Sequence, residues 1–116
     1  MPDSSSSVKT TSWGSLHWLA SREVGNASDI TLGRVVIKAG QSNPRHAHGN
    51  CEEVLYLLAG KLDHSLGDDN VMLAPGDTIV VRSGVFHNAV SLGPEDADMI
   101  VVYSTGQREF TPESDQ

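Results

Sequence analysis

The stretch Gly40–Gly60, GQSNPRHAHGNCEEVLYLLAG, contains three residues that can ligate a metal ion at close spacing. On an extended segment His46 and His48 point to the same side, because side chains two residues apart share a face of a strand. Glu53 follows a short turn and opens an apolar run, and the downstream segment RSGVFHNAV adds His87 as a possible fourth ligand. The spacing therefore indicates a metal site, provided that these four side chains meet.

The size and composition of the chain predict one compact cytoplasmic domain. Its 116 residues are enough for a single hydrophobic core. A lone cysteine, Cys51, rules out an internal disulfide and fits a reducing compartment. The N-terminal segment MPDSSSSVK lacks the apolar region of a secretory signal, and no apolar run is long enough to cross a bilayer.

The charge balance argues against nucleic acid as a partner. Eight basic and fifteen acidic residues give a formal net charge of −7. Such a chain repels a phosphate backbone unless it carries a local basic patch, and the sequence has none. We therefore expect neither nucleic acid nor a membrane as a partner.

Short strands with turn signals between them run through most of the chain. Residues 13–24 fit either a strand or one face of a helix, and we favour a strand. From Ile30 onward, β-branched and apolar runs recur every eight to twelve residues or so, and GDDN between two of them is a hairpin signal. About nine or ten strands without a long helix predict an all-β sandwich or barrel.

The domain organisation follows from this pattern. We expect a disordered, serine-rich tail over residues 1–10, a single barrel over residues 11–107 and a polar C-terminal tail over residues 108–116.

Two ordered motifs resemble those of the cupin family. The first, G-x5-H-x-H-x4-E-x6-G, is matched by Gly40, His46, His48, Glu53 and Gly60. The second family motif, G-x5-P-x-G-x2-H-x3-N, is matched at Gly76, Gly84 and His87. Arg82 and Ser91 stand where the second motif has proline and asparagine, so the departures spare the ligand positions.

The resemblance implies a small single-domain cupin, with a jelly-roll or double-stranded β-helix barrel. It also implies one divalent metal held by His46, His48, Glu53 and His87, and a homodimer. Independently of the family, neutral imidazoles and a carboxylate suit divalent first-row ions, so iron, manganese, nickel and zinc all stay open. Four protein ligands on an ion that prefers six leave two positions for water or substrate.

Residues outside the ligand set are open to more than one interpretation. His64 shares a strand face with Leu62 and Leu66, so it is either a core histidine or a substrate contact or general base. Tyr56 is a second candidate catalytic residue. Tyr56, Phe86 and Trp18 are possible pocket walls, although aromatic residues in a small barrel often only fill the core.

Four further residues are interpreted from their positions. Glu52 should point away from the metal, and Cys51 is interpreted as structural. Arg82 either orients an anionic substrate or lies in solvent, and His17 is expected to be an ordinary hydrogen-bonded residue.

Two functional hypotheses follow. The first is a metal-dependent enzyme acting on a small oxygenated organic molecule that chelates the ion, with dioxygenase chemistry favoured over lyase or isomerase chemistry. The second is a metal- and small-molecule-binding or sensing protein without turnover.

Overall fold

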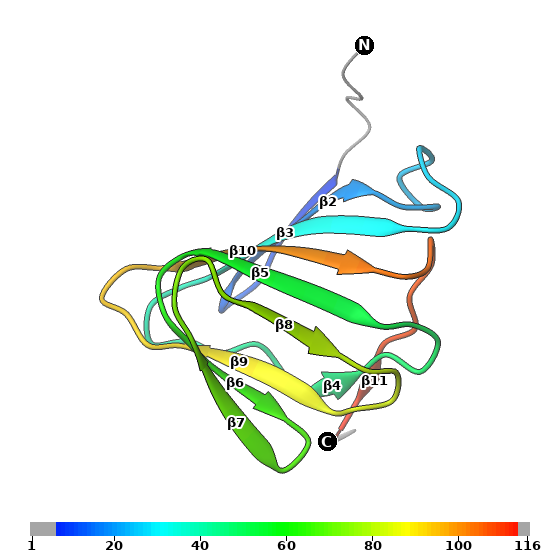
Figure 1. Cartoon of the computed structure of the whole chain (residues 1–116). Coiled ribbons are helices and arrows are strands. Elements are labelled where there is room, and N and C mark those ends of the chain that lie inside the picture. The colour runs from blue at the N-terminus through cyan, green and yellow to red at the C-terminus, as the bar shows by residue number, and fades with distance from the viewer. Residues whose placement is uncertain (1–6, 114–116) are drawn as a thin grey trace.

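The chain folds into two facing antiparallel sheets in the computed structural model, which describes residues 7–113 (Figure 1). One sheet has six strands in the order β1-β2-β3-β10-β5-β8, and the other has five in the order β11-β4-β9-β6-β7. Residues 7–113 contain no helix, and therefore none that could span a membrane. The predicted all-β, jelly-roll type of barrel is confirmed.

The strands are short and follow one another closely along the chain. Their bounds are β1 Ser7–Thr10, β2 Gly14–Ala20, β3 Thr31–Ile37, β4 His46–Ala47, β5 Glu53–Ala59, β6 Leu62–Leu66, β7 Asp69–Leu73, β8 Thr78–Val81, β9 His87–Ser91, β10 Ala97–Tyr103 and β11 Thr111–Pro112. Within residues 13–24, which fitted both a strand and a helix, Gly14–Ala20 form the strand β2, and a turn follows. The predicted hairpin joins β6 and β7 through a turn at Gly67 and Asp68.

Alternation of buried and exposed side chains places the core between the sheets. In β5, Leu55 and Leu57 point inward while Val54, Tyr56 and Leu58 are exposed. The strands β3 and β10 alternate in the same way. The buried leucines and their neighbours each contribute roughly 1.5–3 kcal/mol by leaving water, so the register of these strands is fixed by their apolar parity.

A motif glycine sets the sharp turn after β5. Gly60 has φ +85°, and a Cβ there would lie 2.7 Å from the Cα of Ala97. A side chain would therefore meet both an unfavourable backbone conformation and the backbone of the neighbouring strand.

The structure corrects the expected tails at both ends. Ser7–Thr10, expected to be disordered, form β1 and pair with β2, because an exposed strand can be held by backbone hydrogen bonds without apolar burial. Residues 1–6 lie outside the described residues. At the other end, β11 pairs with β4, so the barrel extends beyond residue 107, and only residues 114–116 lie outside the described range.

Candidate metal centre

The two sheets bring the four predicted ligands together inside the barrel. His46 lies in β4 and is paired directly with His87 of β9, in the five-stranded sheet. Glu53 begins β5 in the opposite sheet, and His48 lies in the short connection between β4 and β5. All four are buried, and one donor atom from each lies within 4.8 Å of the others.

The distances between donor atoms fit one ion. The Oε1 atom of Glu53 lies 3.0 Å from Nε2 of His87 and 3.5 Å from Nε2 of His48. Donors that surround one divalent ion at about 2.1 Å are separated by about 3 Å when adjacent and about 4.2 Å when opposite. The cluster therefore needs only small side-chain shifts to coordinate a metal.

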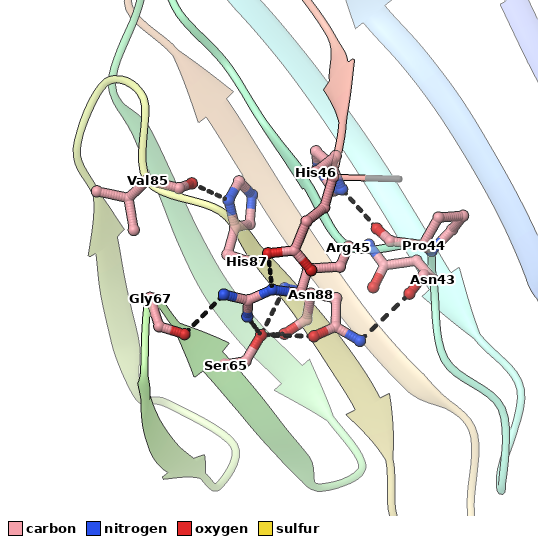
Figure 2. A network of polar contacts seen from close by, with 10 residues as sticks. Asn43, Pro44, Arg45, His46, Ser65, Gly67, Val85, His87 and Asn88 are labelled. Atoms are coloured by element: carbon pink, nitrogen blue, oxygen red, sulfur yellow. Dashed lines mark hydrogen bonds and ion pairs between the residues drawn. The ribbon is translucent and has the colours of Figure 1, made fainter. Parts of the chain in front are cut away.

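Backbone carbonyls fix the orientation of all three histidines. The Nδ1 atoms of His46 and His87 lie 2.6 and 2.9 Å from the carbonyl oxygens of Pro44 and Val85 (Figure 2). The Nδ1 atom of His48 lies 2.7 Å from the carbonyl oxygen of Glu109. Because a carbonyl only accepts, each Nδ1 carries the proton, and each Nε2 lone pair is left for the cluster.

Arg45, next to His46, joins the C-terminal segment to the β6–β7 hairpin. Its guanidinium donates to Oε2 of Glu113 at 2.8 Å, to Oγ of Ser65 at 2.9 Å and to the carbonyl oxygen of Gly67 at 2.7 Å (Figure 2). These three anchors hold the backbone of β4 in place. These hydrogen bonds restrain the backbone on which His46 is carried.

Burial and neighbouring charges set the protonation states. Burial lowers the pKa of His46 to about 4, so this imidazole is neutral near pH 7. Burial on its own raises the pKa of the Glu53 carboxyl, but the adjacent imidazoles of His48 and His87 outweigh it, and the pKa is lowered. A neutral imidazole and an ionised carboxylate are the metal-binding forms of these groups.

His64 lies beside the cluster, as its strand parity indicated. It is 1% exposed, and its ring stacks on that of His87 with centroids 5.7 Å apart. Burial lowers its pKa, and within residues 7–113 its Nδ1 atom has no hydrogen-bond partner. Its position next to His87 is observed, and a chemical role for it stays a prediction.

Tyr56 is wrongly placed by the sequence interpretation. It is 43% exposed on the outer face of β5, because residues 53, 55 and 57 take the inner face. The tyrosine at the site is Tyr103, which pairs with Glu53 in register and contacts the ring of His48 at 4.9 Å between centroids. Burial raises the pKa of Tyr103 well above 10, so its hydroxyl stays protonated. The alternation of inward and outward residues along β10 could have identified Tyr103 from the sequence.

The remaining candidates divide between the cavity and its surroundings. Trp18 lines the cavity as proposed, whereas Phe86 does not. Glu52 and Arg82 are exposed, which rules out the inward orientation considered for Arg82.

Cys51 and His17 lie outside the cluster. Cys51 is buried in the hydrophobic core and burial raises the pKa of its thiol, which agrees with a structural role. His17 lies on β2, one residue out of phase with the cavity-lining Leu16 and Trp18.

A cavity of about 410 Å³ opens onto the cluster. His46, Glu53 and His87 form its polar end, together with His64. Its other walls are mostly apolar and come from the inner faces of β2, β3, β5 and β10. The volume falls in the range of about 300–1,000 Å³ that is usual for pockets binding organic molecules.

The C-terminal segment supplies two cavity residues that the sequence interpretation assigned to a tail. Phe110 stacks on His46 with ring centroids 4.7 Å apart, and Arg108 lies 4.4 Å above the ring of Trp18. Asn50 fixes this segment, since its side chain donates to the carbonyl of Gln107 and accepts from the amide of Glu109, both at 2.9 Å. The pairing of β11 with β4 and these long-range hydrogen bonds bring the two residues to the site, so no local signal in the sequence marks them.

The comparisons with known sequences agree with this architecture. The family described as Cupin domain matches residues 33–103. A germin-like protein 3-8 from Oryza sativa subsp. japonica is 27% identical over 85 residues, which cover 69% of this chain and 38% of the relative. The chain thus spans about two fifths of the length of that relative.

Solved structures share the fold at low sequence identity. The oxalate decarboxylase from Lactobacillus farciminis, as a formate complex, superposes with a TM-score of 0.85 at 18% identity, covering 93% of this chain and 33% of that one. The polyketide cyclase RemF from Streptomyces resistomycificus superposes with a TM-score of 0.76 at 21% identity, covering 90% of this chain and 74% of that one. At these identities the likeness concerns the fold alone.

Proposed function

The chain belongs to the cupin family, and from this premise we propose that it is a metal-dependent enzyme acting on a small oxygenated organic molecule. One observation carries the proposal. Three buried imidazoles donate Nδ1–H to backbone carbonyls and leave three Nε2 lone pairs converging beside the Glu53 carboxylate. Acceptors packed so closely need a positive charge among them, and a divalent cation supplies it.

His46, His48, Glu53 and His87 would hold the ion. Iron, manganese, nickel and zinc all accept this donor set. The bound ion would polarise a carbonyl, enol or carboxylate oxygen of the substrate, and a redox-active ion would add electron transfer with dioxygen. Of the reaction types, dioxygenase chemistry is our first choice, followed by lyase or isomerase chemistry.

The chain's own residues would position the substrate and exclude water. The apolar walls of the cavity lower the local dielectric, which strengthens electrostatic interactions inside it. His64 lines the polar end without being a proposed ligand, and it would contact the substrate there. Tyr103, with its raised pKa, would act as a hydrogen-bond donor rather than a base.

A specific observation also supports the alternative, a binding or sensing cupin without turnover. Among residues 7–113, Glu53 is the only carboxylate that lines the cavity, and it is assigned to the metal. The pKa of His64 is lowered and that of Tyr103 is raised, so neither is tuned to exchange protons near pH 7.

Metal analysis and turnover assays separate these possibilities. Protein purified without chelator is expected to contain about one divalent ion per chain, and His87→Ala should lose it whereas the matched variant His17→Ala should not. Protein reconstituted with iron, manganese, nickel or zinc is then assayed for oxygen uptake and for turnover of diketones and hydroxy acids. Absence of metal contradicts both hypotheses, and metal binding without turnover across this panel favours the sensing protein.

We also propose that the protein is a cytoplasmic homodimer. The support for pairing is an apolar patch on the outer face of β5 and β8, where Val54, Tyr56, Leu58 and Val80 are 38–49% exposed. Light scattering after gel filtration tests it: a dimer that Leu58→Lys converts to a monomer agrees, and a wild-type monomer contradicts the proposal.

A further inference from the structure

We infer that the cavity binds an organic monoanion with an extended apolar body, and that Arg108 selects for its negative charge. The inference deepens the proposed function, because the metal would hold the oxygen atoms of the same molecule. It excludes a small dianion such as oxalate as the preferred ligand.

The walls favour an apolar body. Away from the cluster most of the lining side chains are aromatic or aliphatic, among them Trp13, Leu16, Trp18, Ile37, Leu55 and Met99, and the polar exceptions are Lys9, Thr11, Asn43 and Arg108. The six aromatic and aliphatic side chains offer no hydrogen bond to an oxygen-rich ligand, with the exception of the indole N–H groups. A two-carbon dianion would lose its hydration on entry and gain little from these walls, whereas an alkyl or aryl body would gain apolar contact.

The charged groups at the cavity favour an anion. Lys9 and Arg108 line it, and in the part of the chain that the structure describes Glu53 is the only acidic lining residue. Within residues 7–113, no carboxylate lies within 4.0 Å of the Arg108 guanidinium. A half-buried arginine that forms no ion pair with any described residue is notable in a chain with fifteen acidic residues and a net charge of −7.

Aromatic rings hold Arg108 in a position to bind an anion. Its Cζ lies 4.4 Å from the ring centroid of Trp18, 5.2 Å from that of Tyr103 and 5.8 Å from that of Phe110. A planar guanidinium stacked on rings keeps its N–H groups at the edge, where they can donate to a carboxylate. Tyr103 and Phe110 also contact the ligands His48 and His46, so one layer of rings joins the guanidinium to the metal centre.

Tryptophan fluorescence provides a direct binding assay. The chain has two tryptophans, and both Trp13 and Trp18 line the cavity. Straight-chain carboxylates from acetate to octanoate do not absorb where indole is excited, so each can be titrated. Zinc-loaded protein is used because zinc is redox-inert, and metal-free protein is titrated in parallel. We expect affinity to rise roughly fourfold for each added methylene until the cavity is filled.

Three comparisons test the charge and the apolar body. Octanoate should bind at least about tenfold more tightly than 1-octanol, because only the acid can form charge-assisted hydrogen bonds. Octanedioate should bind more weakly than octanoate, since its second carboxylate would lose its hydration in a cavity whose walls are mostly apolar. Oxalate should bind more weakly than octanoate. Equal affinity for octanoate and 1-octanol, or preferential binding of oxalate, overturns the inference.

Substitutions at Arg108 assign the selectivity to this residue. Arg108→Gln should lower octanoate affinity about tenfold and leave 1-octanol affinity unchanged, with Arg108→Lys in between. The matched control is Arg82→Gln, which removes the same charge from an exposed position and should change neither affinity. If Arg108→Gln affects acid and alcohol equally, or matches Arg82→Gln, Arg108 does not select for the anion.

Zinc content measured on the same samples separates this inference from the proposed function. One result is a protein that binds no zinc and still shows carboxylate affinity that rises with chain length and an acid preference that depends on Arg108. That result would refute the metal centre and preserve the inference. Zinc bound by the four ligands without either dependence would preserve the metal centre and refute the inference.

Discussion

Glu53→Gln is expected to abolish the stabilisation of the protein by divalent metal. The substitution removes the one negative charge from the ligand set with almost no change in side-chain volume. Glu53 is 4% exposed, and its Oε1 atom lies 3.0 Å from Nε2 of His87 and 3.5 Å from Nε2 of His48. The amide would therefore occupy the same buried space among the imidazoles without neutralising the ion.

The magnitude follows from mass action. Metal at one hundred times its dissociation constant stabilises the folded state by about 2.7 kcal/mol. For a chain of this size that corresponds to a rise in Tm of about 10 °C. If the amide weakens metal binding about 100-fold, the same metal concentration adds only about 0.4 kcal/mol, and the rise falls below about 2 °C.

Thermal unfolding followed by circular dichroism, with zinc or manganese added to chelator-treated protein, measures this difference. Glu52→Gln is the matched control, because it removes the same charge one residue earlier, where the side chain is exposed. It should keep the full shift. A Glu53→Gln protein that folds and retains the wild-type shift would refute Glu53 as a ligand, and so would loss of the shift in Glu52→Gln.

The remaining predictions concern stability, each measured by thermal or denaturant unfolding. Burial lowers the pKa of His46 from 6.5 to about 4, so between these values the unfolded chain binds a proton that the folded chain does not. The metal-free protein should therefore lose stability as the pH falls from 6.5 to 4, by up to about 3 kcal/mol, and His46→Gln should flatten this dependence. Gly60→Ala should destabilise the fold by about 3 kcal/mol, whereas Gly25→Ala, which has a positive φ but no atom within 4 Å of a Cβ, should cost only about 1 kcal/mol. Similar losses in these two variants would show that the contact with Ala97 is unimportant. Ser91→Ala should raise the free energy of unfolding by about 1 kcal/mol, because the Oγ atom is buried and has no partner within residues 7–113. A loss of stability there would mean that the hydroxyl is hydrogen-bonded.

The clustering of His46, His48, Glu53 and His87 could be predicted because most of its information is local. His46 and His48 share a face by strand parity, and Glu53 follows after a turn short enough to bring β5 back across the cavity. The prediction that His87 joins the cluster rested on the second motif. In the structure His87 is paired directly with His46 between β4 and β9. Apolar alternation likewise predicted the strands, since burial on one face fixes their register.

Two errors have different physical causes. Tyr56 was assigned to the site although the parity of Glu53, applied consistently along β5, places it outside. That signal was present in the sequence. By contrast, β1 consists of exposed residues held through backbone pairing with β2, and backbone hydrogen bonds leave little trace in residue type.

The C-terminal segment connects the proposed metal centre to the cavity wall. It does so through a backbone carbonyl oxygen, which cannot be recognised from the residue type. The carbonyl oxygen of Glu109 accepts from Nδ1 of His48, while its neighbours Arg108 and Phe110 line the cavity. Every residue has such a carbonyl, so a motif search finds His48 and not the group that orients it. Because one short segment both orients His48, a proposed metal ligand, and forms the cavity wall, we expect a displacement of its backbone to disturb metal affinity and ligand selectivity together. A side-chain change at Arg108 would alter selectivity alone.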